Sequence, residues 1–197
     1  MNCHTLLQLL KADKKRVESH FILKLLYTNT TSFVFWFRLS SYLKSHKYLK
    51  PLHGFAELVR LRQSHKLGIQ LSSATKIGGG ISIKHYSGIV IAEETRIGEN
   101  CTIHRCVTLG RSFGGKHAGC PTIGNHCIIF PGAKVIGKVR LGNNVIVGAN
   151  AVVLHDIPDN CVCAGVPAKI ISSDSSKVIG EERFRKYFGL LKYDRTN

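Results

Sequence analysis

Aliphatic residues recur at every sixth position through the middle of the chain. The residue directly after each aliphatic position is often glycine. The residue four positions after each aliphatic position is usually small or β-branched. Insertions of two and of eight residues divide the repeat into three runs. The runs are Leu71, Ile77, Ile83, Ile89; then Ile91, Ile97, Ile103, Leu109; then Ile123, Ile129, Val135, Leu141, Val147, Val153.

A six-residue period fits neither a straight helix nor a coiled coil, and the β-branched content also opposes helix. The period is typical of a solenoid, in which each unit supplies one short strand and one corner. Three units close a triangular coil of roughly eighteen residues, and stacked coils pair as parallel strands with their aliphatic residues inward. We therefore predict a mainly β chain with a parallel β-helix over residues 69–171, of about four and a half coils.

The flanking segments have helical spacing instead. Apolar residues recur at threes and fours in 6–26, 31–47 and 51–68, and the third segment begins with Pro51 and ends with Gly68. We expect a helical segment at 1–68 that covers the open end of the solenoid. A tail at 172–197 should contain a short helix at 180–193, and the glycine-rich stretch 111–122 should form an extruded loop.

The amino-acid composition limits which ligands and which cellular location we expect. The hydrophobic fraction of 44% excludes disorder over most of the chain, and the formal net charge is +16. Residues 1–70 hold twelve Lys or Arg and three acids, a balance that favours anionic ligands or an anionic membrane surface. We expect no nucleic-acid partner. We expect no secretory signal, and the sequence has no apolar run long enough to cross a bilayer and no Cys-x-x-Cys pair. We expect a cytoplasmic protein with peripheral contact at the inner face of the membrane.

The two-residue insertion follows the unit that contains "KHYSG", with His85 at its centre. On residue type alone, a single histidine at a corner is more often structural than catalytic. The surrounding text is more specific: "KIGGGISIKHYSGIVIAEETRIGENCTIHRCVTLG", "PTIGNHCIIFPGAKVIGKVRLGNNVIVGANAVVLHDIP" and "AGVPAKII". Over about residues 34–171 it resembles the hexapeptide-repeat acyltransferases, most closely their serine acetyltransferase branch.

The resemblance implies a left-handed parallel β-helix, acetyl-CoA as donor, no metal, and a homotrimer with active sites between subunits. It also implies that His85 is the general base, since a histidine can take the proton of an attacking hydroxyl. The backbone N–H of Gly88 is a candidate for holding the oxyanion. The residues that the resemblance assigns to coenzyme A are Gly132, Ala149, Gly165, Val166, Pro167 and Lys169.

The acceptor side departs from the serine pattern. Lys84 stands where that branch has an acid, Gln70 stands where it has the aspartate that orients the histidine, and Cys120 lies in the loop where it has Arg-His-Pro. The loop text "GCPTIGN" is similar to exopolysaccharide O-acetyltransferases of the colanic acid type. We expect Lys84, Gln70, His117 and Cys120 to contact the acceptor, and the acceptor to be a saccharide of a capsule, O-antigen or exopolysaccharide, on a nucleotide or lipid carrier.

Three other hypotheses remain. Serine O-acetylation for cysteine synthesis is the main alternative, and a non-catalytic β-helix that assembles or binds is a more distant one. A zinc site of the carbonic-anhydrase type would need three histidines to converge from among His85, His104, His117 and His126. Because His104 and His126 fall at corners of the ladder, we expect both at the surface.

Overall fold

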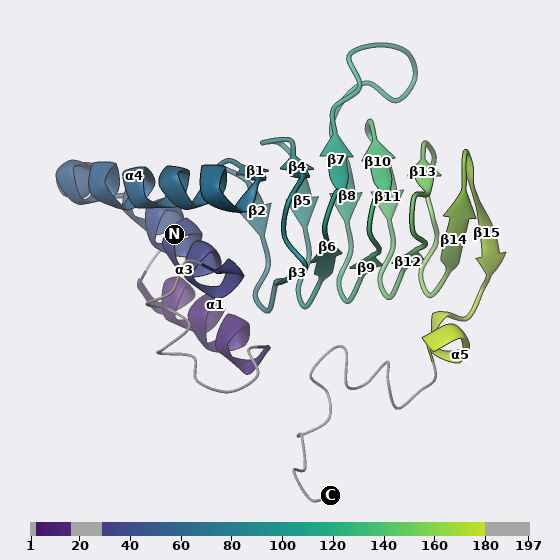
Figure 1. Cartoon of the computed structure of the whole chain (residues 1–197), viewed down its shortest axis with the longest axis horizontal. Helices are drawn as coiled ribbons and strands as arrows, with labels where there is room; N and C mark the ends of the chain where they lie inside the picture. The colour runs from purple at the N-terminus through teal and green to yellow at the C-terminus, as the bar shows by residue number, and fades with distance from the viewer. Residues whose placement is uncertain (1–2, 17–28, 180–197) are drawn as a thin grey trace, which may run out of the picture.

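The computed structural model describes residues 3–16 and 29–179, where a stack of short strands follows three α-helices (Figure 1). The strands form a solenoid of triangular section, and each regular coil contributes one strand to each side. The strands are β1 Ile69–Leu71, β2 Lys76–Ile77, β3 Ser82–Lys84, β4 Ile89–Ile91, β5 Arg96–Ile97, β6 Thr102–His104, β7 Thr108–Gly110, β8 Thr122–Ile123, β9 Ile128–Ile129, β10 Lys134–Ile136, β11 Arg140–Leu141, β12 Ile146–Val147, β13 Val152–Val153, β14 Val162–Gly165 and β15 Ala168–Ser172.

Three sheets run along the solenoid. The first has the order β1-β4-β7-β10-β13, the second β2-β5-β8-β11, and the third β3-β6-β9-β12-β14-β15. Every pair is parallel except β14 with β15, which form an antiparallel hairpin at the far end. The parallel β-helix predicted from the six-residue period is therefore confirmed.

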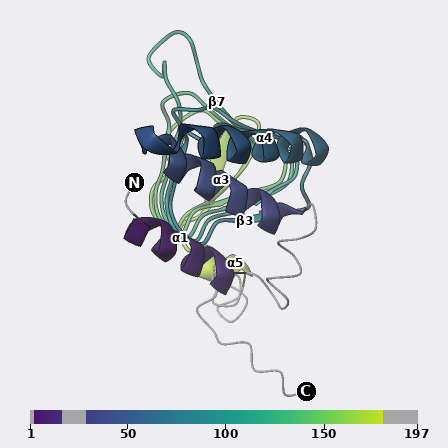
Figure 2. The same ribbon diagram turned by 90° about the vertical axis from the view of Figure 1, so that its left-hand side faces the viewer.

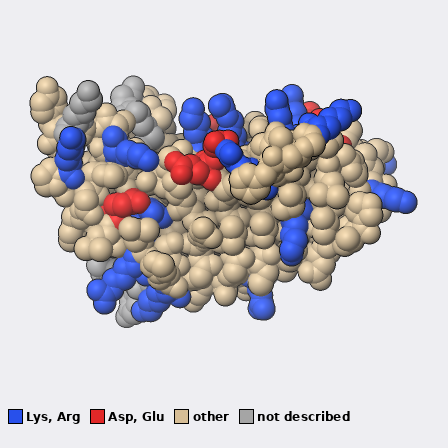
Figure 3. Space-filling model, turned by 90° about the horizontal axis from the view of Figure 1, so that it is seen from above, with Lys and Arg blue, Asp and Glu red and all other residues tan. Residues whose placement is uncertain are grey.

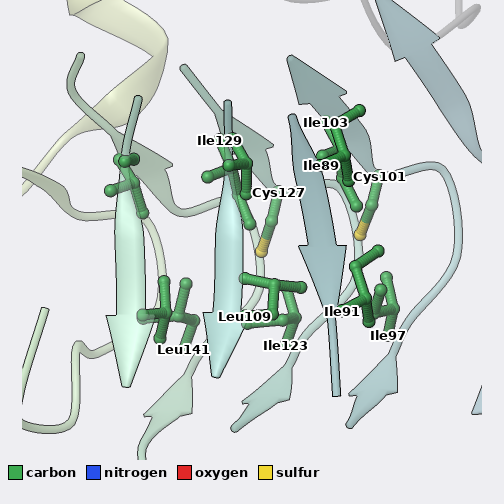
Figure 4. Packing of buried hydrophobic residues seen from close by; sticks show 14 of the residues in the cluster. Ile89, Ile91, Ile97, Cys101, Ile103, Leu109, Ile123, Cys127, Ile129 and Leu141 are labelled. Atoms are coloured by element: carbon green, nitrogen blue, oxygen red, sulfur yellow. The ribbon is translucent and has the colours of Figure 1, made fainter. Parts of the chain in front are cut away.

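The six-residue period produces three aliphatic columns inside the solenoid. In the first sheet Leu71 pairs with Ile91, Ile91 with Leu109, and Leu109 with Val135. All the ladder residues are buried, and Figure 4 shows them stacked beside the thiols of Cys101 and Cys127. A single coil could not bury these side chains alone, so stacking of coils is the main source of hydrophobic stabilisation.

The corners between strands stack as closely as the strands do. A β-carbon added to Gly124 would lie 2.4 Å from the carbonyl oxygen of Gly142 in the next coil, which explains glycine there. Asparagines at other corners adopt the left-handed conformation that they tolerate better than most residues, at Asn100, Asn144 and Asn160 with φ of 55°, 57° and 60°.

Helices cover the end of the solenoid at β1 (Figure 2). They are α1 Cys3–Lys15, α3 Thr30–Lys44, a short 3-10 turn η1 Lys47–Leu49, and α4 Lys50–Leu67, with α5 Ser175–Ile179 after β15. The predicted proline start and glycine stop both hold for α4, since Pro51 lies in its first turn and Gly68 caps it with φ 63°. The second half of the helix predicted at 6–26, and the helix predicted at 180–193, lie mostly or wholly outside the described residues.

No coil precedes the first one. Two buried arginines therefore donate hydrogen bonds to backbone carbonyls of the first coil. Arg38 donates to the carbonyls of Ile77 and Gly78 at 2.5 Å each, and Arg60 donates to that of Leu71 at 2.5 Å. Phe33 and Phe37 of α3 are buried in the same core as the ladder. The helices thus close both the apolar core and the polar edge of the first coil.

The surface carries its positive charge widely. Seen from above, Lys and Arg stand along the whole face, and smaller patches of Asp and Glu lie between them (Figure 3). Within the described part of the chain, no helix is both long enough and apolar enough to span a membrane.

Candidate active site

The turn that contains His85 is wider than the corresponding corner of the next coil. Lys84 pairs with His104 and Val90 pairs with Thr108, so the five residues of this turn correspond to only three in the next coil, Arg105, Cys106 and Val107. The turn has an unusual backbone, because His85, Ser87 and Gly88 have positive φ values of 50°, 112° and 67°. The structure therefore places the predicted two-residue insertion at His85 itself, and the histidine is exposed there.

The turn is fixed on both sides. The amide of Cys106 donates to the carbonyl of Ser87 at 2.8 Å, and the amide of Ile89 donates to the carbonyl of Gly68 at 3.1 Å. A β-carbon on Gly68 would lie 3.2 Å from the nitrogen of Gly88, so the end of α4 packs directly against the turn. These contacts hold the strained backbone in place.

His85 belongs to a stack of three rings. Lys84 pairs in register with His104, so the two histidines lie in neighbouring coils, with ring centroids 6.3 Å apart. His104 in turn stacks on Phe130 at 5.1 Å, with the two ring planes only 8° apart. The stack gives the exposed His85 an aromatic neighbour on the solenoid surface.

His104 is buried, so the expectation that it lies at the surface is wrong. It points outward from β6, but His85 and Phe130 cover it. His104 Nδ1 lies 3.0 Å from the carbonyl oxygen of Ile129 and must donate the proton in that bond, which leaves Nε2 as the acceptor. Burial lowers the pKa of His104, and its electrostatic interactions with His85 and Lys84 lower it further. The ring is therefore neutral near pH 7.

A cavity of about 290 Å³ opens beside His85, between the helices and β3. Its lining from the solenoid is the strand β3 with the residues on either side of it. Its lining from the helical part comes from α1 and α3. The lining residues are Leu10, Asp13, Arg16, Thr30, Thr31, Val34, Phe35, Ile81, Ser82, Ile83, Lys84, His85 and Tyr86.

The residues assigned to coenzyme A follow His85 along one edge of the solenoid. That edge contains the turns after β3, β6, β9 and β12, which are linked by the bonds from Cys106 N to Ser87 O, Gly132 N to Arg105 O (3.1 Å) and Asn150 N to Pro131 O (2.9 Å). Gly132 and Ala149 lie in these turns. Gly165 ends β14, Val166 and Pro167 connect β14 to β15 at the far end, and Lys169 is exposed on β15.

The other predicted acceptor residues are spread more widely. Lys84 lines the cavity with His85, while Gln70 lies with its side chain exposed in β1, opposite Val90. The loop of 111–122 leaves after β7, at the opposite end of the strands from β3's turn (Figure 1). His117 is exposed in it, and Cys120 is half-buried next to Arg111, whose pKa that thiol and Glu94 raise. Within one chain the loop and His85 are therefore on different edges.

The described part of the chain contains no cluster of side chains that would support a zinc site. Among residues 3–16 and 29–179, no three His, Cys, Asp or Glu side chains lie close enough together to hold a metal ion. His85 and His104 are neighbours, but His117 is on the loop edge.

Sequence reasoning misjudged one residue near the candidate base, His104, and missed two others, Asp13 and Arg16. The first had a signal, because one widened coil is twenty residues long, so residue 104 must lie beside residue 84. The other two come from α1 and the residue after it, more than sixty positions away, and no periodic pattern connects them to β3.

Comparison with known proteins fits this geometry. The sequence profile described as "Bacterial transferase hexapeptide (six repeats)" matches residues 120–155. The serine acetyltransferase of Helicobacter pylori strain J99 is 38% identical over 138 residues, which cover 70% of this chain and 78% of that protein.

Solved structures agree with that match. The serine acetyltransferase of Neisseria gonorrhoeae superposes with a TM-score of 0.70 at 30% identity, covering 85% of this chain and 66% of that one. The Brucella abortus enzyme, crystallised with coenzyme A, gives 0.70 at 29% identity, covering 87% and 68%. The chain thus spans about two thirds of the crystallised relatives. None of these names supports the likeness of the loop to exopolysaccharide enzymes. The chain belongs to the hexapeptide-repeat acyltransferases, in their serine acetyltransferase branch.

Proposed function

We propose that this acetyl-CoA-dependent O-acetyltransferase acts directly on an acceptor hydroxyl, with His85 as the general base and L-serine as the first candidate acceptor. The observation that carries the proposal is the position of His85. It stands in a fixed, strained turn beside a 290 Å³ cavity, at one end of the edge on which the residues assigned to coenzyme A lie.

In the proposed reaction His85 accepts the hydroxyl proton while the oxygen attacks the thioester carbonyl carbon. The N–H of Gly88 donates to the oxyanion that forms. When the carbon–sulfur bond breaks, the imidazolium of His85 returns the proton to the sulfur, so free CoA thiol and the acetyl ester leave. No covalent enzyme intermediate is needed, and Cys120 has no nucleophilic role in this scheme.

The acceptor proposal rests on the relatives, which are named serine acetyltransferases. A specific observation favours the second candidate, a saccharide: the cation of Lys84 lines the cavity where that branch carries an acid. Gln70 and Cys120 replace further polar groups of the serine pattern. Both candidates use the same base and the same donor, so they differ only in what occupies the cavity.

We also propose a homotrimer in which the loop of one subunit reaches the His85 turn of its neighbour. What supports this is the separation of His117 and Cys120 from His85 within one chain. Mixing inactive His85→Ala subunits with subunits that lack 112–119 should restore part of the activity, because some interfaces then combine an intact histidine with an intact loop. Absence of any restored activity, with trimers confirmed by analytical ultracentrifugation, would contradict the shared site.

The function is tested by following CoA thiol release from acetyl-CoA with L-serine, nucleotide sugars or de-O-acetylated polysaccharide. We expect His85→Ala to reduce turnover by roughly 10²–10⁴-fold with an unchanged far-UV spectrum. His65→Ala, an exposed histidine of α4, is the matched control and should leave turnover unchanged. Wild-type turnover by His85→Ala would overturn the assignment of the base, and turnover with saccharides but not with serine would replace the acceptor.

A further inference from the structure

The helix α4 carries large apolar side chains on its outer side. Four of them, at intervals of three residues, are 41–65% exposed and are called the outer row here: Leu52, Phe55, Leu58 and Leu61. Residues three apart are neighbours on a helix surface, so these side chains follow one another along it. Only one leucine of α4, Leu67, is buried. A surface helix normally turns its apolar stripe towards the core, so packing within this chain does not explain the outer row.

The helical part of the chain carries exposed cations but no exposed carboxylate among its described residues. Its two described acids are both engaged, since buried Asp13 pairs with Arg38 at 2.9 Å and half-buried Glu57 pairs with Arg60 at 2.6 Å. The exposed cations within 3–16 and 29–68 are Lys11, Lys14, Lys15, Lys44, Lys50, Arg62 and Lys66. Three of these belong to α4 and lie towards its two ends, so positive charge flanks the outer row.

An anionic lipid surface matches both features. Leucine and phenylalanine side chains of an interfacial helix insert at the boundary between headgroups and acyl chains, and each Lys or Arg near anionic lipid adds to the attraction. The helix α4 runs across the end of the solenoid, with the outer row open to solvent (Figure 2). A protein partner would need a groove shaped for the row, whereas a bilayer accepts a convex apolar row of any shape.

We infer that α4 is a membrane-contacting helix, which lies along an anionic bilayer surface with the outer row directed into it. The inference concerns the outside of the helical cap. It depends neither on the identity of the acceptor nor on the role of His85, and its tests need no turnover.

The single tryptophan of the chain is a probe of this contact. Trp36 of α3 meets the ring of Phe55 edge-on, with the centroids 6.0 Å apart. Purified full-length protein is mixed with vesicles of equal parts phosphatidylglycerol and phosphatidylcholine, or of phosphatidylcholine alone. Co-sedimentation should show roughly tenfold tighter binding to the anionic vesicles, and about 0.5 M salt should remove most of that preference. Anionic vesicles with brominated acyl chains should quench the emission of Trp36.

A pair of substitutions removes the centre of the outer row. Phe55→Ser combined with Leu58→Ser should weaken binding to anionic vesicles by roughly tenfold or more, measured by co-sedimentation. Phe113→Ser combined with Leu154→Ser is the matched control, because these are also an exposed phenylalanine and an exposed leucine, but in the solenoid part of the chain. The control pair should bind as the wild type does.

A second pair removes charge and keeps the outer row. Lys50→Gln combined with Lys66→Gln should weaken binding to anionic vesicles about tenfold and leave the weak binding to phosphatidylcholine unchanged. Lys76→Gln combined with Lys138→Gln, two exposed lysines of the solenoid, is the control and should have little effect. Far-UV spectra and calorimetric CoA binding check that every variant is folded.

Three results would overturn the inference. One is absence of binding to anionic vesicles, or equal binding to both kinds. Another is binding that neither quenches Trp36 nor responds to Phe55→Ser with Leu58→Ser, because the contact would then lie on another surface. The third is a lower oligomeric state of that variant in analytical ultracentrifugation without vesicles, because the outer row would then join copies of this chain.

Discussion

The turn after β3 and the corner after β6 connect the same two sheets in successive coils, yet only the first forms a site. The corner at Arg105 and Cys106 is short, and coils pack against it from both sides. The turn at His85 is longer, and on one side it has helices in place of a coil. Two inserted residues and a change of neighbour therefore turn a structural corner into an exposed base beside a cavity.

The most direct test of this comparison is to make the turn after β3 as short as the corner after β6. Deleting Tyr86 and Ser87 would leave His85 and Gly88 as a corner like that at Arg105 and Cys106. We expect turnover to fall below roughly one hundredth of the wild-type value, because His85 loses its position. We expect the coils to remain stacked. Thiol release measures the first effect, and thermal unfolding with calorimetric CoA binding measures the second. Retained turnover would show that the width of the turn is not needed.

The second difference, the helical neighbour, is tested at Arg38. Arg38→Ala leaves Asp13 as a buried unpaired charge and removes the donors to Ile77 and Gly78. We expect a loss of about 3–5 kcal/mol in the free energy of unfolding, measured with urea. Arg96→Ala, an exposed arginine of β5, is the control and should cost under about 0.5 kcal/mol. A small effect at Arg38 would mean that the first coil does not depend on its helical cap.

The regular part of the molecule was predictable because one constraint repeats. Every coil must place an aliphatic residue in each of three columns, so the period of six indicates the strands, the core and both insertions. His85 was reached through the resemblance and through the insertion beside it. Arg16 and Asp13 were not, because they meet β3 only through helix packing. His104 was misjudged for a related reason: its outward direction follows from the period, but its cover by Phe130 and His85 depends on neighbours across the sheet.

A third prediction concerns the acid sensitivity of the helical cap at Glu57. Hydrogen bonds from Arg60, opposed by burial and supported by Ser40, lower the pKa of Glu57 from 4.5 to about 2. Because the folded-state pKa is depressed, the stabilisation is complete above pH 4.5 and is lost as the pH falls through 4.5 towards 2. It amounts to at most about 3 kcal/mol. Urea unfolding at pH 6 and pH 3 should show a larger difference for the wild type than for Glu57→Gln. Equal differences would contradict the linkage.

The smallest effect is expected at His104, where two variants test whether the aromatic ring positions His85 by stacking. His104→Phe keeps a ring between His85 and Phe130, whereas His104→Leu fills the space without one. We expect kcat to fall about threefold to tenfold in the leucine variant and to stay nearer the wild type in the phenylalanine variant, because a flat ring still orients His85. Both variants lose the bond to Ile129, so loss of that bond alone cannot explain a difference between them.

The pH dependence of stability gives an independent test of the role of His104. The pKa of His104 is lowered in the folded protein, so the unfolded chain takes up its proton first, and stability falls as the pH drops below about 6.5. Both variants should lose this part of the acid sensitivity between pH 7 and pH 5, a window above that of Glu57. If the phenylalanine and leucine variants turn over equally, the ring stack does not position His85. The wide turn alone would then hold the base, and the corner after β6 would contribute only packing.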